Sequence, residues 1–299
     1  MITDEWLEKN TIHKILGGSR LYGTSTVFSD YDYRGVCLMP KETLLGLDNF
    51  EQYESNINNK DVIIYGINKF IRLAIHANPN ILDILFATPE RWLVSSFTWE
   101  YIYNHRRLFL TQEIRKTFSG YAHSELQRAS RHHRWLTVPP VKPDYQDYHG
   151  TLVRLPNGTQ EVMFISHADK DNYDVALSDW NNYQTWLINR NENRLTNEMK
   201  VGYNVKNAAH LVRLLLKCEM ILDVCDYDPV LSGKHLDMVT EVLQCNWSYE
   251  RLLDFAKRQQ LIINNMTSYL PHKINYETIN DLVMYLNYYT LIKNNIRND

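Results

Sequence analysis

Short apolar runs separated by polar turns occupy the first hundred residues, and this pattern predicts the strands of a small sheet. Residues 12–16 form a mostly apolar run that ends at two glycines, which is typical of a buried strand entering a tight turn. Residues 31–39 alternate between apolar and polar side chains until Pro40, and residues 61–67 are mostly apolar after an initial Asp. Both runs favour strands.

Helical spacing follows the last of these strands. Residues 69–77 repeat apolar side chains at helical intervals, and Asn68 in front of them is a residue type that caps helices. A second short helix is expected from about residue 80 to residue 86, with Pro79 at its start. A short acidic helix is predicted for residues 1–10.

Beyond about residue 100 the periodicity is mainly helical. Residues 206–222 and residues 249–260 each predict an amphipathic helix. Residues 151–165 differ, because two apolar stretches flank Asn157-Gly158, and Asn-Gly between alternating residues is a strong signal for a β-hairpin.

The composition is that of a globular protein with a sizeable core. The chain has 299 residues, of which 44% are hydrophobic and 22% charged, so it is long enough for one large domain or two ordinary ones. We expect an α+β fold. A short mixed sheet with flanking helices would occupy residues 1–105, and a mainly helical domain residues 106–299, with the hairpin inserted near 151–165.

The charge excludes a generic nucleic-acid binder, because the formal net charge is -3. Any affinity for RNA must therefore come from a local patch. Residues 115–142 are one candidate: they contain many cations and a single acid, Glu125. This stretch is either an RNA contact or a solvated helix face. Its basic and aromatic residues are Arg115, Lys116, Arg128, Arg131, His132, His133, Arg134, Trp135 and Lys142.

The cysteines favour a reduced, cytoplasmic protein. Cys37, Cys218, Cys225 and Cys245 form no CxxC pair and have no zinc-finger spacing with histidine. The N-terminus lacks the basic and apolar regions of a signal peptide. No run of about 18 apolar residues predicts a membrane span, so we expect no membrane partner.

Two carboxylates behind a glycine turn are the main candidate for chemistry. Gly18-Ser19 follows the first predicted strand, and Asp30 and Asp32 lie two positions apart, so on a strand they point to one face. Adjacent carboxylates repel each other, and Mg²⁺ relieves this repulsion because it binds carboxylate and phosphate oxygens. Glycine in the turn lets the backbone approach a phosphate closely.

This arrangement resembles the Gly-Ser…Asp-x-Asp signature of the DNA polymerase beta nucleotidyltransferase superfamily. That superfamily uses a third carboxylate on a neighbouring strand, and Asp61 has the matching strand context. Its rivals are Glu51 and Glu54, in the expected polar loop before that strand, and Asp83 on the following helix. A strand-initial Asp that merely faces solvent stays open as an alternative for Asp61.

The resemblance extends over residues 12–260 to a nucleotidyltransferase family associated in some genomes with RNA repair. The last matching block usually contains Asp-x-Lys-His, but here Asn204 and Asn207 flank the retained Lys206. The blocks that carry the resemblance are SRLYGTSTVFSDYDYRGV, DVIIYGINKFIRLAIHANPNILDILF, GYAHSELQR and RNENRLTNEMKVGYNVKNAAHLVRLL.

One face of the helix predicted for residues 206–222 carries Lys206, His210 and Arg213. A charged face on an otherwise apolar helix should meet an anion or an acid. It would either hold the triphosphate or the acceptor, through lysine and bidentate arginine contacts, or form a solvated face with a satisfied histidine.

The resemblance implies a polymerase-beta-like arrangement of the N-terminal core. It also implies a metal-dependent transfer of a nucleoside monophosphate from an NTP to a hydroxyl, with RNA as a candidate acceptor and pyrophosphate as product. Asp30, Asp32 and Asp61 would hold Mg²⁺ or Mn²⁺. Two alternatives stay open: an AMP transferase of toxin–antitoxin type that modifies a protein, and a non-catalytic nucleotide- or RNA-binding protein. No serine-hydrolase elbow and no Walker A motif is present. The candidate nucleotide-binding residues are Gly18, Ser19, Arg20, Arg34, Lys206, His210 and Arg213, although Arg34 could instead pair with Asp30 or Asp32.

Overall fold

A five-stranded mixed sheet forms the N-terminal part of the molecule. The computed structural model describes residues 3–57, 60–189 and 192–296. The strands lie in the order β3-β4-β2-β1-β5. Their bounds are β1 Thr11–Leu16, β2 Tyr31–Cys37, β3 Gln52–Ile57, β4 Lys60–Gly66 and β5 Trp92–Ser95.

Strand direction determines which residues meet in this sheet. β1 pairs antiparallel with β2 and with β5, and β3 pairs antiparallel with β4. The one parallel pair, β2 with β4, places Asp32 directly beside Asp61. The mixed sheet, the helices and a separate hairpin confirm the α+β class. The finer expectation, a polymerase-beta-like arrangement of the core, stays a prediction.

The strands and helices predicted from apolar patterning lie where they were expected, with three corrections. The expected polar loop around Glu54 is wrong, because this segment pairs with β4 as strand β3. Asn68 does not cap the next helix, because Gly66 is the cap and the helix already includes Ile67. Strand β5 was not predicted, since four residues are too few to show alternation.

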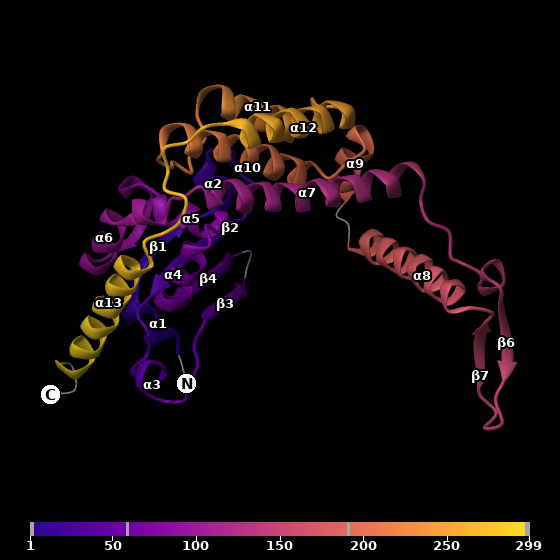
Figure 1. The fold of residues 1–299 in the computed structure, drawn as a ribbon, viewed down its shortest axis with the longest axis horizontal. Coiled ribbons are helices and arrows are strands. Elements are labelled where there is room, and N and C mark those ends of the chain that lie inside the picture. Colours follow the sequence, from indigo (N-terminus) through magenta and orange to yellow (C-terminus); the bar gives the residue numbers. More distant parts are fainter. Residues whose placement is uncertain (1–2, 58–59, 190–191, 297–299) are drawn as a thin grey trace.

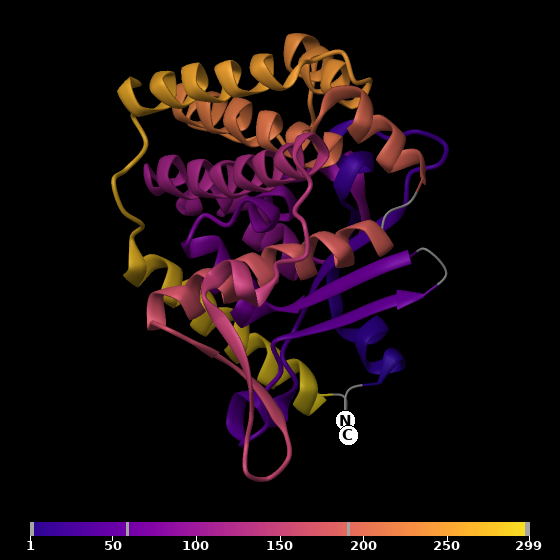
Figure 2. The same ribbon diagram turned by 90° about the vertical axis from the view of Figure 1, so that its right-hand side faces the viewer.

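Helices cover the sheet and build a second layer. Figures 1 and 2 show α7, α10 and α12 stacked on one side of the sheet-containing part, with α13 returning along it. Three short 3₁₀ turns, η1 Pro89–Arg91, η2 Arg106–Phe109 and η3 Tyr145–Tyr148, connect elements. The helices are α1 Asp4–Asn10, α2 Gly18–Tyr22, α3 Lys41–Leu45, α4 Ile67–Ile75, α5 Pro79–Phe86, α6 Phe97–Asn104, α7 Glu113–Thr137, α8 His167–Ile188, α9 Glu192–Val201, α10 Val205–Val224, α11 Gly233–Leu243, α12 Tyr249–Asn265 and α13 Tyr276–Ile296.

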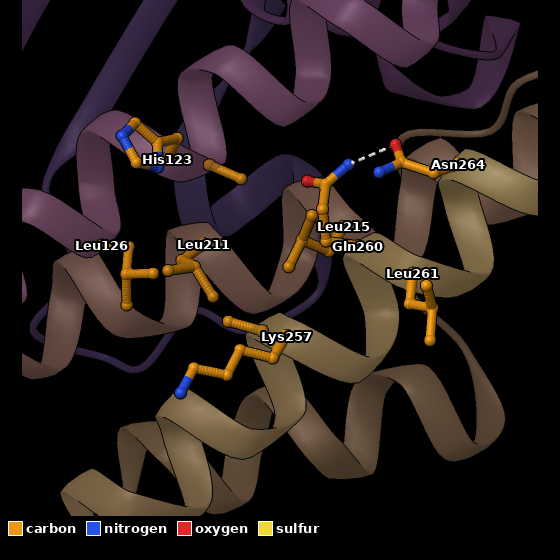
Figure 3. Close-up of a pocket in the computed structure, with 10 residues that line it drawn as sticks. His123, Leu126, Leu211, Leu215, Lys257, Gln260, Leu261 and Asn264 are labelled. Carbon is orange, nitrogen blue, oxygen red and sulfur yellow. Dashed lines mark hydrogen bonds between the residues drawn. The ribbon is translucent and has the colours of Figure 1, made fainter.

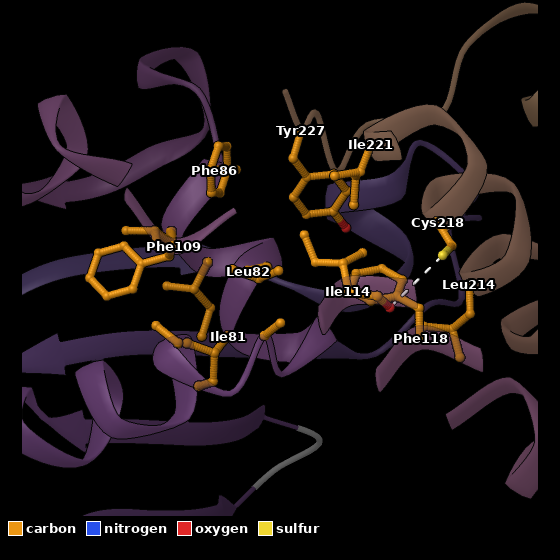
Figure 4. Close-up of a cluster of buried hydrophobic side chains, with 14 of the residues drawn as sticks. Ile81, Leu82, Phe86, Phe109, Ile114, Phe118, Leu214, Cys218, Ile221 and Tyr227 are labelled. Carbon is orange, nitrogen blue, oxygen red and sulfur yellow. Dashed lines mark hydrogen bonds between the residues drawn. The ribbon is translucent and has the colours of Figure 1, made fainter. Parts of the chain in front are cut away.

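The hydrophobic core is continuous from the sheet into the helical layer. One cluster of buried side chains includes Ile15 of β1, Leu82 of α5, Phe118 of α7 and Leu214 of α10. Figure 4 shows where α5, α7 and α10 meet, with Phe86, Phe118 and Tyr227 among the side chains that fill the junction. Since burial of apolar surface is the main stabilising contribution to folding, the two parts stabilise each other. The expected division at residue 105 stays a prediction.

The predicted hairpin is confirmed, and it belongs to an arm that projects from the helical layer (Figure 1). β6 Gly150–Arg154 pairs antiparallel with β7 Gln160–Phe164. Gly158 has a φ of 85°, the left-handed conformation that this turn requires and that glycine adopts readily. α8 follows the hairpin, and an aromatic group of Trp135, Tyr183 and Trp186 attaches it to the end of α7.

Within residues 3–57, 60–189 and 192–296, no helix is long and apolar enough to cross a membrane.

Candidate active site

The glycine turn between β1 and α2 lies directly against the carboxylate of Asp32. The Gly17 amide donates to the Asp32 carbonyl at 2.7 Å, which fixes the turn to β2. Gly18 has a φ of 59°, and a Cβ at this position would overlap Oδ2 of Asp32. Any larger residue would therefore displace the carboxylate as well as strain the backbone. The Ser19 side chain forms no hydrogen bond within the described part of the chain.

Asp32, Arg34 and Asp61 form a charged group at the edge of the turn, which we call the open cluster. Asp32 and Asp61 are register partners on β2 and β4, and their side chains are 29% and 38% exposed. Nη2 of Arg34 lies 2.6 Å from Asp61 Oδ2 and 3.6 Å from Asp32 Oδ1. Arg34 thus pairs with two carboxylates, one of the roles that the sequence left open for it.

Arg20 lies in α2, and Asp30 lies at the end of the loop that joins α2 to β2. The Arg20 guanidinium donates to the carbonyls of Ser29 at 2.7 Å and Asp30 at 3.2 Å, and it stacks on the Tyr31 ring at 3.9 Å. Arg20 therefore fastens this loop in the present structure. Asp30 is exposed directly before β2, and by strand alternation it belongs to the face of Asp32.

The donor set suits a hard divalent cation. Asp32 and Asp61 present carboxylate oxygens side by side, the ligand type that Mg²⁺ and Mn²⁺ prefer. The Arg34 guanidinium already neutralises part of their charge, and a cation between them would have to displace it. Among the described residues, no three acidic, histidine or cysteine side chains come together as a metal group.

A cavity of about 230 Å³ adjoins the open cluster. Within the described residues, neither the Tyr65 hydroxyl nor the Asn80 side-chain amide forms a hydrogen bond. Burial raises the pKa of Tyr65, against the opposing effect of Arg34, so its hydroxyl stays protonated and can donate. The cavity is thus lined by polar groups available to a ligand. Its wall consists of Ile15, Gly17, Gly18, Leu21, Tyr22, Arg34, Ile63, Tyr65, Asn80, Asp83 and Ile84.

Asp83 belongs to a second charged group, which we call the sealed cluster: Tyr22, Asp83, Arg213 and Tyr227. Asp83 and Arg213 are each 3% exposed, and Arg213 Nη1 lies 3.3 Å from Asp83 Oδ2. The hydroxyls of Tyr22, at 2.7 Å, and of Tyr227 donate to the same carboxylate. Arg213 also stacks on the Tyr22 ring at 3.8 Å. Asp83 is therefore fully engaged, which weakens it as a rival third carboxylate.

Two of the three residues on the charged face of α10, His210 and Arg213, lie next to acids. Arg213 pairs with Asp83, and His210 Nδ1 lies 3.9 Å from Glu125 Oε1. Desolvation, together with the charges of Arg213 and Arg128, lowers the pKa of His210 to about 3, so this ring is neutral at pH 7.

These placements change the expectation for a triphosphate contact on this face. The Arg213 guanidinium is buried and His210 carries no charge, so in this structure neither presents a cation to solvent. Lys206 is exposed in the first turn of α10 and has no ion pair within the described residues. A phosphate contact on this face stays a prediction for Lys206.

The residues that sequence reasoning missed are those whose partners lie far along the chain. Tyr22 and Tyr227 gave no local signal. Asp83 gave one, because it is an acid in α5, a helix in which every other described residue except Asn80 is apolar and buried. Such an acid needs a buried partner, but the sequence does not show that the partner is Arg213, 130 positions away.

The basic stretch lies mostly on α7, where several of its cations are already paired. Arg128 donates to Glu125 at 2.8 Å, and Arg134 donates to Asp179 of α8 at 2.8 Å. His133 stacks on Tyr249. The RNA contact expected for residues 115–142 stays a prediction.

A groove between α7, α10 and α12 has a different character. Figure 3 shows Leu126, Leu211 and Leu215 along it, with Lys257 nearby and Gln260 hydrogen-bonded to Asn264 at 2.9 Å. Its apolar lining offers no carboxylate pair for a metal. The open cluster is therefore the better candidate for chemistry on phosphates.

Comparison with known proteins identifies the family of this chain. The family described as RNA repair pathway DNA polymerase beta family (RlaP) matches residues 4–261. Over 129 residues the chain is also 32% identical to an uncharacterized 38.9 kDa protein of the nrdC-mobD intergenic region in Enterobacteria phage T4. That similarity covers 40% of this chain and 38% of the phage protein.

Proposed function

Because the chain belongs to the RNA repair pathway DNA polymerase beta family, a branch of the polymerase-beta nucleotidyltransferases, we propose that it transfers a nucleoside monophosphate from an NTP to a hydroxyl acceptor. RNA is the acceptor that the family description favours. Pyrophosphate is the second product.

One observation carries this proposal: Asp32 and Asp61 lie in register on parallel strands, and Asp32 is pressed against the Gly17-Gly18 turn. Nucleotidyl transfer needs carboxylates that hold a divalent cation next to a backbone that admits phosphate oxygens. Both requirements are met here, because the carboxylate pair and the glycine turn are adjacent in space. The adjoining cavity offers the Tyr65 hydroxyl and the Asn80 amide to the rest of the substrate.

Asp32 and Asp61, with Asp30 on the same face, are the residues that would hold Mg²⁺ or Mn²⁺. When bound, such an ion neutralises phosphate charge and makes the acceptor hydroxyl more acidic. Arg34 would then exchange its carboxylate contacts for the phosphates, as a guanidinium binds both kinds of oxyanion.

The reaction itself is an in-line displacement. The acceptor oxygen forms a bond to the α-phosphorus while the bond from that phosphorus to the bridging oxygen of the β-phosphate breaks. Asp61 would accept the hydroxyl proton, and the electron pair of the broken bond leaves with pyrophosphate. The Gly18-Ser19 turn would hold the departing phosphates.

The test is labelling with each of the four α-³²P-NTPs in the presence of Mg²⁺ or Mn²⁺, with total RNA or a protein lysate as acceptor. We expect label in RNA and none with Asp32→Asn. Label in protein would identify the AMP transferase alternative. Nucleotide binding without transfer to either acceptor would identify a non-catalytic binding protein.

A further inference from the structure

We infer that the sealed cluster is a positioning device for the candidate active site: through Tyr22 it holds α2, and through α2 it holds the carboxylate of Asp32. The catalytic consequence of this inference rests on the proposed function. The mechanical part, the fixing of α2, does not depend on it.

The two ends of α2 have different surroundings. Its first residue, Gly18, lies against Oδ2 of Asp32 in the open cluster. Its last residue, Tyr22, donates to Asp83 at 2.7 Å and lies under the Arg213 guanidinium. A helix of five residues has too few internal hydrogen bonds to be stable alone, so contacts at its ends determine its position.

The backbone at the far end of α2 is held as well. The Leu231 amide donates to the Tyr22 carbonyl at 3.1 Å, so the segment after α10 satisfies a carbonyl at the end of the helix. That segment also carries Tyr227, which donates to Asp83. One stretch of chain therefore binds both the Tyr22 backbone and the carboxylate that accepts from the Tyr22 side chain.

A buried lysine fixes this segment to α10. Lys217 is 1% exposed, and its ammonium donates to the carbonyls of Asp228 and, at 2.7 Å, Val230. Those residues come directly after Tyr227 and directly before Leu231. α10 thus supplies Arg213 to the side chain of Tyr22 and, through Lys217, orders the loop that binds its backbone.

The protonation states agree with this network. Burial raises the pKa of both Tyr22 and Tyr227 well above the ordinary tyrosine value, so both hydroxyls stay protonated and donate to Asp83. Two hydroxyl donors and one guanidinium satisfy the carboxylate of Asp83. Tyr22, Tyr227 and Arg213 therefore hold this carboxylate in place. Because Tyr22 belongs to α2, its hydrogen bond to Asp83 restricts movement of α2.

The decisive variant is Tyr22→Phe, which removes one hydroxyl and keeps the ring under Arg213. The matched control is Tyr203→Phe, because the Tyr203 hydroxyl is also buried and donates to a single partner, the Trp247 carbonyl, at 3.0 Å. Both variants lose one buried hydrogen bond, so both should lower the melting temperature to a similar extent. Only Tyr22→Phe should act on α2.

Two measurements separate positioning from stability. Hydrogen exchange of the amides in residues 18–24 should become faster in Tyr22→Phe and not in Tyr203→Phe. With the acceptor found by labelling, kcat of Tyr22→Phe should fall roughly 10- to 100-fold, the scale for a small misplacement of reacting groups, while Tyr203→Phe keeps the kcat of the wild type.

Unchanged exchange in residues 18–24 of Tyr22→Phe would overturn the inference, as would an equal loss of kcat in both variants. A wild-type protein that transfers no nucleotide, together with faster exchange in Tyr22→Phe alone, would refute the proposed function and leave the positioning of α2 supported.

Discussion

The open cluster and the sealed cluster each pair an arginine with aspartate, and their surroundings differ in the extreme. In the open cluster, Arg34 is 21% exposed and its partners Asp32 and Asp61 are 29% and 38% exposed. In the sealed cluster, the side chains of Arg213 and Asp83 are each 4% exposed. The same two residue types therefore face water in one place and the protein interior in the other.

Solvent decides what each pair can do. An exposed ion pair contributes only about 0–1 kcal/mol to stability, because water and salt screen it. Arg34 can consequently leave Asp61 for a substrate phosphate at little cost. A buried pair has no such freedom, because removing either partner leaves an uncompensated charge in the interior. The open cluster is therefore suited to binding a substrate, and the sealed cluster is suited to stabilising the fold.

The largest effect should come from breaking the sealed cluster. Asp83→Ala leaves Arg213 buried without its partner, and we expect a loss of about 3–5 kcal/mol in the free energy of unfolding. Urea unfolding followed by circular dichroism measures this change. Asp61→Ala is the control from the open cluster and should cost less than about 1 kcal/mol. Equal losses in the two variants would remove the distinction between the clusters.

The next effect concerns activity. It should be large for variants of the open cluster, which should lose little stability. Asp32→Asn and Asp61→Asn should each lower nucleotidyl transfer by about 10³-fold, since the contribution of a bound divalent cation to the transition state is several kcal/mol. Their melting temperatures should stay near that of the wild type. Transfer by Asp61→Asn at the wild-type rate would exclude Asp61 as the third carboxylate and return attention to Glu54.

Arg34→Ala sharpens the comparison at a smaller scale. If the guanidinium moves to a phosphate when substrate binds, its loss should weaken NTP binding by about 1.5–3 kcal/mol, or roughly 10- to 150-fold. Titration calorimetry with an NTP measures the change, and Arg258→Ala is the control, because Arg258 is exposed on α12 and pairs with Asp254. Affinity that is unchanged in Arg34→Ala would make this residue a structural counter-ion only.

The last effect is on acid stability. The pKa of His210 is lowered from 6.5 to about 3 in the folded state, mainly by desolvation and also by Arg213 and Arg128. Between these pH values the unfolded chain binds the proton more strongly, so stability falls as the pH drops from 6.5 toward 3. Urea unfolding at several pH values should show a shallower fall for His210→Gln than for the wild type.

His123→Gln provides the matched control for this pH series, because His123 is exposed on α7. It should reproduce the wild-type slope. An identical slope for His210→Gln would mean that the ring of His210 is hydrated and gains its proton normally.

Local signals predicted the open cluster and long-range contacts made the sealed one. The turn at Gly18, the spacing of Asp32 and the apolar strand after Asp61 are all visible in short windows of sequence, and the parallel pairing of β2 with β4 then aligns the two acids. The hairpin was predictable for the same reason, because Asn157-Gly158 determines its turn locally.

The rest depended on the tertiary structure. The charged face of α10 was expected to meet an anion or an acid, and only the fold shows that Arg213 meets Asp83. Strands β3 and β5 form because neighbouring strands offer free backbone groups, and their own sequences contain little alternation. Gly66 rather than Asn68 is the cap of α4, since β4 runs directly into the helix.

The hydrogen bond from Leu231 to Tyr22 also has a consequence for the order of synthesis. A ribosome that adds about 5–20 residues per second completes Leu231 roughly 10–40 s after Tyr22. For most of that interval Arg213, the partner of Asp83, has not been synthesised. The loop that binds the C-terminal end of α2 through Leu231 is also incomplete. The nascent chain therefore carries the candidate carboxylates Asp30, Asp32 and Asp61 early but reaches a fixed geometry only late. On the proposed function, activity would begin only with the folding of the helical layer, and an incomplete chain would leave cellular nucleotides and acceptors untouched.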